Sequence, residues 1–255
     1  MTDDLAEALR SGEIVAAFQP KVTLATRELT GVEALARWHS PTLGHVAPDI
    51  FIPLAERSGL IGALTQVVLR DALDMAVTLR RYAPEMTMAV NISPNMLVDH
   101  DLPATLDRAL HRAGLPPSAF VAEITESQVI HDPQRAGATL SALRARGMAC
   151  SIDDFGTGHA SLLSLLRLPF SELKIDRAFV AECATERDAQ RIVRATLGLA
   201  REMQLHVVAE GIETEDAERT LRSLGCVSGQ GFRYGRPMDA EAMLTAARSG
   251  EFTAG

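Results

Sequence analysis

Polar and charged side chains that could bind or activate a ligand stand at the carboxyl ends of apolar, strand-like segments in this 255-residue sequence. They are Glu33 with Arg37, Asn91, Glu123, Asp153 with Asp154, Lys174 with Asp176, Glu210 and Gln230. In a βα barrel the carboxyl ends of the strands form one shared mouth, so these side chains would converge there. The acidic members would repel one another unless they were protonated or neutralised by cations. Their placement therefore predicts a cation site.

The chemical types of these side chains indicate which cation would bind. Carboxylate and amide oxygens are hard ligands, and the set contains neither histidine nor cysteine, so Mg²⁺ or Mn²⁺ is favoured over Zn²⁺. The adjacent Asp153 and Asp154 could bridge a pair of ions, and two metals about 4 Å apart suit the in-line displacement of a phosphodiester. Lys174 would hold or polarise the attacking water. The sequence thus favours metal-dependent phosphodiester chemistry.

Each of these residues, taken singly, also has a structural interpretation. Asn91 could cap a turn, Glu210 could cap the following helix, and Lys174 could pair with the aspartate two residues later. Glu33 and Arg37 share one face of their strand-like segment and could pair with each other. Only the joint placement of all these residues at strand ends favours a metal site.

The first elements that would position these residues form a hairpin. Two β-rich segments, residues 14–24 and 29–38, are separated by four residues, which is too short for the dozen or so residues of a parallel crossover. They are therefore predicted to pair as antiparallel strands. After them the pattern changes to helical segments that alternate with short apolar runs, beginning with Gly59–Tyr82 and residues 86–93.

The alternation continues to the end of the chain. Further strands are predicted at residues 120–125, 148–155, 171–176, 205–211 and 227–232. Further helices are predicted near Asp101–Ala113, Pro133–Arg146, Arg187–Gln204, Glu215–Leu224 and Ala240–Ala247. Eight strands joined by right-handed crossovers favour a closed barrel, with an open doubly wound sheet as the alternative. The sequence has no linker and no internal repeat, which predicts one domain over residues 1–255.

Charge and composition restrict the classes of function. Asp and Glu outnumber Lys and Arg by 33 to 25, which argues against a broad surface for a nucleic-acid polymer but not against a small phosphorylated ligand. The acidic start and the lack of an apolar run approaching about 18 residues predict a cytoplasmic protein without membrane insertion. Cys150, Cys183 and Cys226 are odd in number and widely spaced, so we expect reduced structural thiols.

Short motifs occur in a characteristic order along the whole sequence. They are FQP at 18–20, EALARW at 33–38, FIPLAE at 51–56, VNIS at 90–93, EITES at 123–127, DDFGTG at 153–158, LKIDRAFV at 173–180, VAEGIET at 208–214 and GQGF at 229–232. In these motifs the chain resembles the EAL-domain phosphodiesterases, which hydrolyse the bacterial second messenger cyclic di-GMP. The resemblance implies an α/β fold, a modified TIM (β/α)8 barrel with one antiparallel strand, in agreement with the predicted N-terminal hairpin.

The resemblance also implies a role for each candidate residue. It assigns metal binding to Glu33, Asn91, Glu123, Asp153, Asp154 and Glu210. Two ions of Mg²⁺ or Mn²⁺ are implied, with Asp153 and Asp154 shared with or binding the second ion, and Ca²⁺ is expected to inhibit. Lys174 would position the nucleophilic water, and it is grouped as catalytic with Asp153, Glu33 and Glu126. Substrate or supporting contacts are implied for Gln19, Arg37, Asp176, Glu213 and Gln230.

One role implied by the resemblance concerns the loop after residue 153. Glu126 would anchor this glycine-rich loop and couple the metal site to a homodimer interface, although Glu126 could instead cap a helix. The loop would end in a helix that begins at His159–Leu162, and a glycine-rich run alone is weak support for a phosphate cradle. His159 replaces an aromatic residue that is usual in the family, and Val227 replaces a common aspartate. Neither departure removes a predicted metal ligand.

The predicted function is therefore the metal-dependent hydrolysis of cyclic di-GMP to linear 5'-pGpG. One alternative is a catalytically silent domain that binds cyclic di-GMP as a receptor, or binds only another protein. A metal-dependent barrel acting on an unrelated phosphoester or sugar would explain the carboxylates but not the ordered motifs. If the chain is a fragment, sensor or diguanylate cyclase domains are the expected neighbours.

Overall fold

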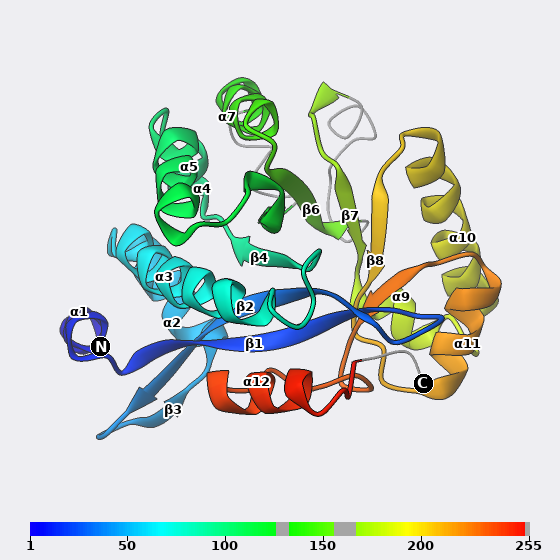
Figure 1. The fold of residues 1–255 in the computed structure, drawn as a ribbon, viewed down its shortest axis with the longest axis horizontal. Coiled ribbons are helices and arrows are strands. Elements are labelled where there is room, and N and C mark those ends of the chain that lie inside the picture. Colours follow the sequence, from blue (N-terminus) through cyan, green and yellow to red (C-terminus); the bar gives the residue numbers. More distant parts are fainter. Residues whose placement is uncertain (126–132, 156–166, 253–255) are drawn as a thin grey trace.

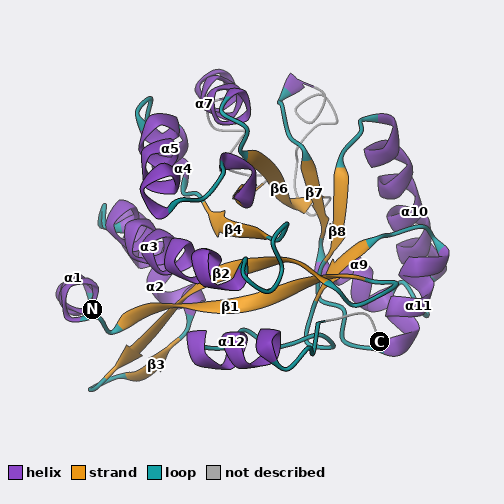
Figure 2. Cartoon of the chain, viewed as in Figure 1, coloured by secondary structure: helices purple, strands orange, loops and turns teal. Residues whose placement is uncertain are grey.

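Eight strands close into a barrel that is covered on its outside by helices (Figures 1 and 2). The computed structural model describes residues 1–125, 133–155 and 167–252. The barrel strands are β1 (Ile14–Thr23), β2 (Leu29–Ser40), β4 (Thr87–Asn91), β5 (Phe120–Thr125), β6 (Ala149–Phe155), β7 (Glu172–Ile175), β8 (His206–Ala209) and β9 (Ser228–Gln230). They neighbour one another in the order β1-β9-β8-β7-β6-β5-β4-β2, and pairing of β1 with β2 closes the ring. The predicted closed barrel is confirmed, and the open sheet is not what forms.

The single antiparallel strand of the barrel is β1. It runs antiparallel to both of its neighbours, with Gln19 opposite Glu33 of β2 and Lys21 opposite Gln230 of β9. The remaining neighbouring pairs of the ring are parallel. The predicted N-terminal hairpin is therefore confirmed, and a short connection is the reason, because it cannot cross over to a parallel neighbour.

The predicted helices form with ends within three residues of those expected. They are α3 (Ile61–Leu79), α5 (Leu102–Ala113), α7 (Pro133–Ala145), α10 (Arg187–Glu202), α11 (Glu215–Ser223) and α12 (Ala240–Arg248). The largest difference is at the end of α3, which was predicted to reach Tyr82 and ends at Leu79. Its predicted start included Gly59. That glycine has φ 75°, a left-handed conformation that a helix cannot continue through.

Several short elements were not predicted. They are α1 (Thr2–Ser11), β3 (Gly44–Val46), α2 (Pro48–Arg57), α4 (Pro94–Leu97), a 3₁₀ turn at Pro117–Ala119 and α9 (Arg177–Glu182). β2 continues past the barrel and turns back through Gly44 at φ 71°, so that Trp38 pairs with Val46 of β3. Trp38 also packs with Leu5 of α1 and Phe51 of α2 in a second apolar cluster. Contacts with this cluster stabilise α1, β3 and α2, whereas α4 and α9 pack on the main core through Leu97 and Val180.

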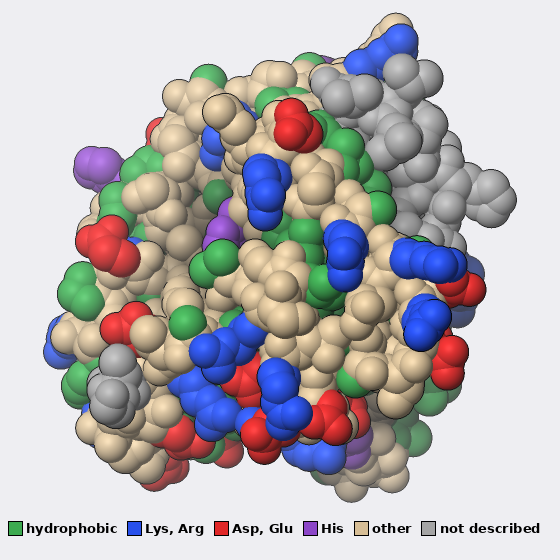
Figure 3. Space-filling model, turned by 90° about the vertical axis from the view of Figure 1, so that its right-hand side faces the viewer, with side chains coloured by type: hydrophobic (Ala, Val, Ile, Leu, Met, Phe, Trp, Pro, Cys, Tyr) green, Lys and Arg blue, Asp and Glu red, His purple; other side chains and the backbone are tan. Residues whose placement is uncertain are grey.

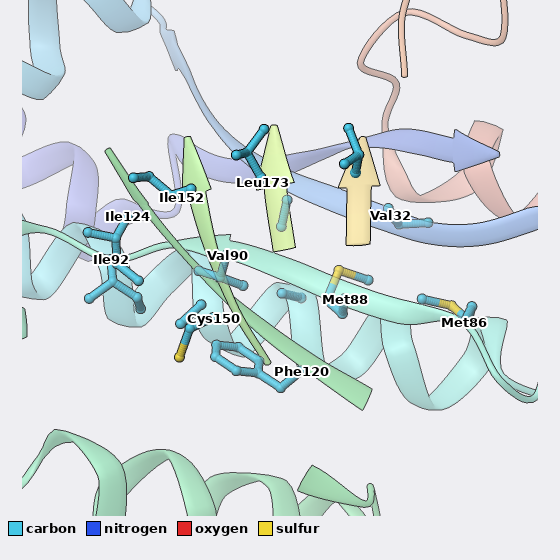
Figure 4. Close-up of a cluster of buried hydrophobic side chains, with 14 of the residues drawn as sticks. Val32, Met86, Met88, Val90, Ile92, Phe120, Ile124, Cys150, Ile152 and Leu173 are labelled. Atoms are coloured by element: carbon cyan, nitrogen blue, oxygen red, sulfur yellow. The ribbon is translucent and has the colours of Figure 1, made fainter. Parts of the chain in front are cut away.

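Side chains alternate between an apolar outside and a polar inside along the barrel strands. Val32, Val90, Ile124, Ile152 and Leu173 are buried on the outer face, toward the helices (Figure 4). The residues between them point into the barrel, where the buried polar side chains include Lys21, Glu33, Glu123, Ser151, Glu172, Lys174 and Gln230 beside the apolar Ala89 and Val121. The apolar core therefore lies between strands and helices, and the barrel interior is a charged layer that needs internal partners.

The outer surface beside α10 and α11 has mixed charge. Figure 3 shows Arg side chains interspersed with Asp and Glu side chains on this face. Arg219, for example, lies 3.4 Å from Glu215 and 3.3 Å from Asp216 within α11. Within the described ranges, no helix combines the length and the apolar character that crossing a membrane requires.

Candidate active site

A cavity of about 900 Å³ opens where the carboxyl ends of the parallel strands meet α2 and α3. Its lining includes seven of the residues predicted for the site: Glu33, Arg37, Asn91, Asp153, Asp154, Asp176 and Glu210. These residues come from β2, β4 and β6 and from the segments that follow β7 and β8. The convergence expected for the mouth of a βα barrel is what the fold produces.

Lys174 is the centre of the acidic cluster beneath this cavity. Its Nζ atom lies 3.3 Å from Glu33 Oε2, 3.2 Å from Asp153 Oδ2 and 2.7 Å from Glu210 Oε1. Lys174 Nζ also lies 3.2 Å from Glu123 Oε2. The side chains of Lys174 and Glu123 are fully buried. Within the described residues Lys174 forms ion pairs with these four carboxylates and not with Asp176, so the structural alternative of a Lys174–Asp176 pair is not what forms.

Asp153 and Asp154 reach the cavity because β6 contains a bulge. Between Ile152 and Phe155 the register with β7 shifts, since β6 advances by three residues while β7 advances by two. Asp154 has φ 57°, a left-handed conformation that aspartate adopts more readily than most residues. Asp153 Oδ1 accepts a hydrogen bond of 2.9 Å from the Asp154 amide. The bulge interrupts the alternation of the strand, so both carboxylates line the same cavity.

Amide side chains fix the carboxylate of Glu33. Asn91 Nδ2 donates to Glu33 Oε1 at 3.1 Å, and Gln230 Nε2 donates to Glu33 Oε2 at 2.6 Å. Gln230 Nε2 also donates to Gln19 Oε1, while Gln19 Nε2 donates to the Gly235 carbonyl. Since the nitrogen of Asn91 is bound to Glu33, its amide oxygen is the atom that could bind a cation.

The proximity of like charges alters the acidity of the cluster. Burial alone would raise the pKa of Glu33, but Lys174 and Lys21 outweigh burial and lower this pKa to about 2. Burial raises the pKa of Glu123 to about 8, and the charge of Glu33 adds to this effect. Burial also raises the pKa of Glu210 to about 7. The metal-free cluster therefore retains protons near neutral pH.

The donor set fits a divalent cation. Carboxylate oxygens of Asp153, Asp154 and Glu210 lie within 4.8 Å of one another. Glu123 Oε2 is buried and accepts no hydrogen bond from the described residues. The cluster therefore has more carboxylate groups than ammonium groups, and Glu123 Oε2 lacks a hydrogen-bond donor among the described residues. Mg²⁺ or Mn²⁺ would neutralise this excess negative charge, because both ions prefer hard oxygen ligands.

Two further charged residues inside the barrel were missed by the sequence reasoning. Lys21 Nζ lies 2.6 Å from Glu123 Oε1 and 3.6 Å from Glu172 Oε1, and all three residues are buried. The signal that could have found them is the period of two. Lys21 stands two residues after Gln19, and Glu172 stands two residues before Lys174, so each shares the inward face of its strand.

The structural alternatives suggested for single residues are not the contacts observed. Glu33 is bound by Asn91, Gln230 and Lys174. Arg37 lines the cavity, and its Nη1 atom donates to the carbonyl of Ala36 at 2.7 Å. Helix α11, which Glu210 could have capped, is capped by the hydroxyl of Thr214.

The remaining predicted residues are placed less directly. Asp176 lines the cavity and caps α9 by accepting a hydrogen bond of 2.8 Å from the Ala178 amide. Gln19 is buried behind Gln230, and Glu213 is exposed. Neither is among the described residues that line the cavity. Glu126, His159 and the helix expected at residues 159–162 lie outside the described residues.

Comparison with known proteins identifies the family of this barrel. The sequence profile of the EAL domain matches residues 2–237. The chain belongs to the EAL domain family. The match covers nearly the whole chain, so the family resemblance of the motifs is confirmed.

Relatives of this EAL domain include named phosphodiesterases. It is 44% identical over 242 residues to the bifunctional diguanylate cyclase/cyclic di-GMP phosphodiesterase MucR of Pseudomonas aeruginosa, which covers 94% of the chain and 35% of MucR. It is 37% identical over 226 residues to the cyclic di-GMP phosphodiesterase PA2567 of the same species, covering 89% of the chain and 38% of that relative. The chain thus spans about a third of the length of these curated relatives.

Solved structures of the family have the same fold as this EAL domain. The phosphodiesterase of PaMucR in complex with c-di-GMP has a TM-score of 0.86 and 42% identity, covering 94% of this chain and 98% of that one. The EAL enzyme Bd1971 in its cAMP- and cyclic-di-GMP-bound form has a TM-score of 0.92 and 31% identity, covering 96% and 68%. The closed barrel with helices around it is therefore the fold of the family.

Proposed function

We propose that this EAL domain hydrolyses cyclic di-GMP to linear 5'-pGpG with the help of two Mg²⁺ or Mn²⁺ ions. The observation that carries the proposal is the convergence of Glu33, Glu123, Asp153 and Glu210 on Lys174 beside the large cavity. The naming of MucR and PA2567 as cyclic di-GMP phosphodiesterases supports the choice of substrate. A receptor without activity would not need the complete acidic cluster.

In this proposal the metal ligands are Glu33, Asn91, Glu123, Asp153, Asp154 and Glu210. Bound divalent ions would lower the pKa of a water molecule and neutralise charge on the phosphate. Asp153 and Asp154 contribute to the same site because the β6 bulge presents both of them. Lys174 would hold the attacking water, and Gln230 would keep Glu33 oriented through its hydrogen bond of 2.6 Å.

The substrate would occupy the cavity between this cluster and α2. Arg37 is the proposed phosphate contact, because it lines the cavity and has N–H groups that could donate to phosphate oxygens. Asp176, which also lines the cavity, is a proposed supporting contact. The phosphate contact of Gln19 and the substrate contact of Glu213 stay predictions. The role of Glu126 as a loop anchor at a homodimer interface is likewise a proposal.

The wider context of the domain is also proposed. We propose that the chain forms one domain over residues 1–255 and acts in the cytoplasm. Because the chain spans about a third of its curated relatives, sensor or cyclase domains could accompany it in a longer protein. Cyclic di-GMP is the proposed small-molecule partner, and no nucleic-acid polymer is proposed.

Incubation with cyclic di-GMP and Mn²⁺ or Mg²⁺ should produce linear pGpG, identified by chromatography. Chelation should stop the reaction, because the carboxylates need cations to assemble water and phosphate. Ca²⁺ should permit substrate binding but suppress hydrolysis, since its longer and more variable coordination would misplace the water. Binding without turnover in Mn²⁺ and Mg²⁺ would identify a receptor instead, and turnover of an unrelated phosphoester alone would support the other alternative.

Metal binding should release protons and strengthen as the pH rises. Glu123 and Glu210 have pKa values raised to about 8 and about 7 in the metal-free protein, and each must lose its proton before its carboxylate can bind a cation. Metal affinity should therefore increase as the pH passes through these values and level off above them. Calorimetry in two buffers of different ionisation enthalpy measures the protons released. A pH-independent affinity without proton release would contradict the assignment of these two ligands.

A further inference from the structure

Lys21 lies inside the barrel, one layer below the proposed metal ligands. Its place on β1 is opposite Gly31 of β2 and Gln230 of β9, and only 3% of the residue is exposed. The sequence contains two lysines among its 25 Lys and Arg residues, Lys21 and Lys174, and both are buried in the barrel. A Cβ atom at Gly31 would lie 2.8 Å from Thr87 Oγ1 and 3.6 Å from Lys21 Cδ. The absence of a side chain at Gly31 thus leaves room beside the lysine stem.

The two lysines contact different oxygens of Glu123. Lys21 Nζ donates to Glu123 Oε1 at 2.6 Å, from the side of the amino ends of the parallel strands. Lys174 Nζ lies 3.2 Å from Glu123 Oε2, on the side of the cavity. Within the described chain, Oε2 accepts no hydrogen bond. One oxygen of this fully buried carboxylate is therefore hydrogen-bonded to Lys21, and the other faces Lys174 and the proposed metal site.

Glu172 is the second carboxylate partner of Lys21, on the side away from the acidic cluster. Its Oε1 atom lies 3.6 Å from Lys21 Nζ, and the pair lines a second cavity of about 420 Å³ at the opposite end of the barrel from the acidic cluster. Lys21 is thus shared between a carboxylate of the proposed metal centre and a carboxylate outside it. Because both partners are buried, the ammonium cannot exchange these contacts for water without leaving a charge unpaired.

The number of oxygens that a carboxylate offers affects which metal it favours. Ca²⁺ accepts six to eight oxygen ligands and often binds both oxygens of one carboxylate, whereas Mg²⁺ requires nearly ideal octahedral geometry. The two oxygens of one carboxylate subtend an angle much narrower than an octahedral edge. We propose that Lys21 is a positioning residue that restricts Glu123 to one ligand oxygen and so makes the centre discriminate Mg²⁺ and Mn²⁺ from Ca²⁺. This inference rests on the metal centre of the proposed function.

The test measures binding of each metal alone to chelator-stripped protein by calorimetry. The variant Lys21→Met with Glu172→Gln removes the ammonium and its lower partner together, so the net charge of the pair is unchanged. Its affinity for Mg²⁺ and Mn²⁺ should fall by roughly 10- to 100-fold, as for residues that orient a metal ligand. Its affinity for Ca²⁺ should fall much less or rise, because Glu123 Oε1 becomes available. A merely structural role would lower all three affinities by one factor, and that result would overturn the inference.

Two matched variants keep the inference testable even if the double variant folds poorly. Glu172→Gln alone retains Lys21 and should keep the Mg²⁺ to Ca²⁺ affinity ratio of the parent. A Mg²⁺ to Ca²⁺ affinity ratio in Glu172→Gln as low as in the double variant would overturn the inference. In a Glu123→Gln background, Lys21→Met should leave the ratio unchanged, because Lys21 acts through Glu123, and a further shift would also overturn it.

The outcomes for the parent protein separate this inference from the proposed function. A parent that binds metals and hydrolyses cyclic di-GMP, with an unchanged ratio in the double variant, overturns the role of Lys21 alone. A parent that binds metals without hydrolysis overturns the proposed function, while the ratios still decide the role of Lys21. A parent that binds no divalent cation overturns both.

Discussion

Asp153→Asn should nearly abolish hydrolysis of cyclic di-GMP while preserving the fold. Asp153 lies 3.2 Å from Lys174 and contributes to the three-carboxylate group with Asp154 and Glu210. A neutral amide at the position proposed to be shared by two cations would weaken both and leave the water insufficiently activated. The rate should fall by at least about 100-fold, more than is typical for a residue that only supports a ligand. Product chromatography at saturating substrate measures this loss.

The fold should survive because asparagine is nearly isosteric with aspartate. Its side-chain oxygen can still accept the hydrogen bond that the Asp154 amide donates to Asp153, so the bulge keeps its internal bond. Calorimetry in Ca²⁺ should therefore show cyclic di-GMP bound to the variant. Near-parental turnover of Asp153→Asn would contradict the assignment of the metal centre.

Arg37→Ala provides the comparison for substrate recognition. Arg37 lines the cavity, and its Nη1 atom donates to the carbonyl of Ala36. Loss of charge-assisted hydrogen bonds to a phosphate should weaken binding by roughly 10- to 100-fold, with a smaller effect on the rate at saturation. The two variants thus separate metal chemistry from phosphate recognition.

Lys174→Met should destabilise the metal-free protein and abolish hydrolysis. The ammonium of Lys174 lies within 3.3 Å of carboxylate oxygens from Glu33, Glu123, Asp153 and Glu210. Removing the buried cation that pairs with these carboxylates is expected to lower the free energy of unfolding by about 3–5 kcal/mol. Proton uptake by the carboxylates would offset part of this loss. Thermal unfolding in chelator measures the loss. Since divalent cations would replace the missing charge, Mn²⁺ should raise the Tm of this variant more than that of the parent.

Arg191→Met is a suitable control for that experiment. Arg191 is exposed on α10 and pairs with Asp188 at 2.8 Å within the helix. Exposed ion pairs contribute little, so this variant should match the parent in Tm and in its response to Mn²⁺. An unchanged Tm for Lys174→Met in chelator would show that the lysine does not neutralise the cluster.

Local patterns in the sequence were sufficient to predict the barrel. The four-residue connection after residue 24 required an antiparallel hairpin, and the alternation of helical segments with apolar runs predicted the parallel strands that follow. These features depend on neighbouring residues, because strand period, helix period and loop length are local properties. The acidic character of the site was likewise determined by the sequence, since carboxylates at the carboxyl ends of the strands lie together at the mouth of a closed βα barrel.

Only the tertiary structure decided which groups touch inside that barrel. Lys21 meets Glu123 across 102 residues of sequence, and Gln230 meets Glu33 across 197. Closure brings β1 against both β2 and β9, and the register of these pairings sets the layer that each inward side chain occupies. A sequence motif cannot specify that layer, because a shift of one residue would turn every side chain to the opposite face.

The bulge at Asp154 and the position of Gln19 show the same limit. The sequence places two aspartates together, but the left-handed conformation at φ 57° and the register shift with β7 are what bring both to one cavity. The family resemblance suggested Gln19 as a phosphate contact, which stays a prediction, and only the fold places its amide beside Gln230 and the Gly235 carbonyl. The sequence by itself determines the residue types and the order of the elements. The partner of each buried side chain depends on long-range strand pairing, because a buried polar group must be hydrogen-bonded to a group that the fold brings next to it.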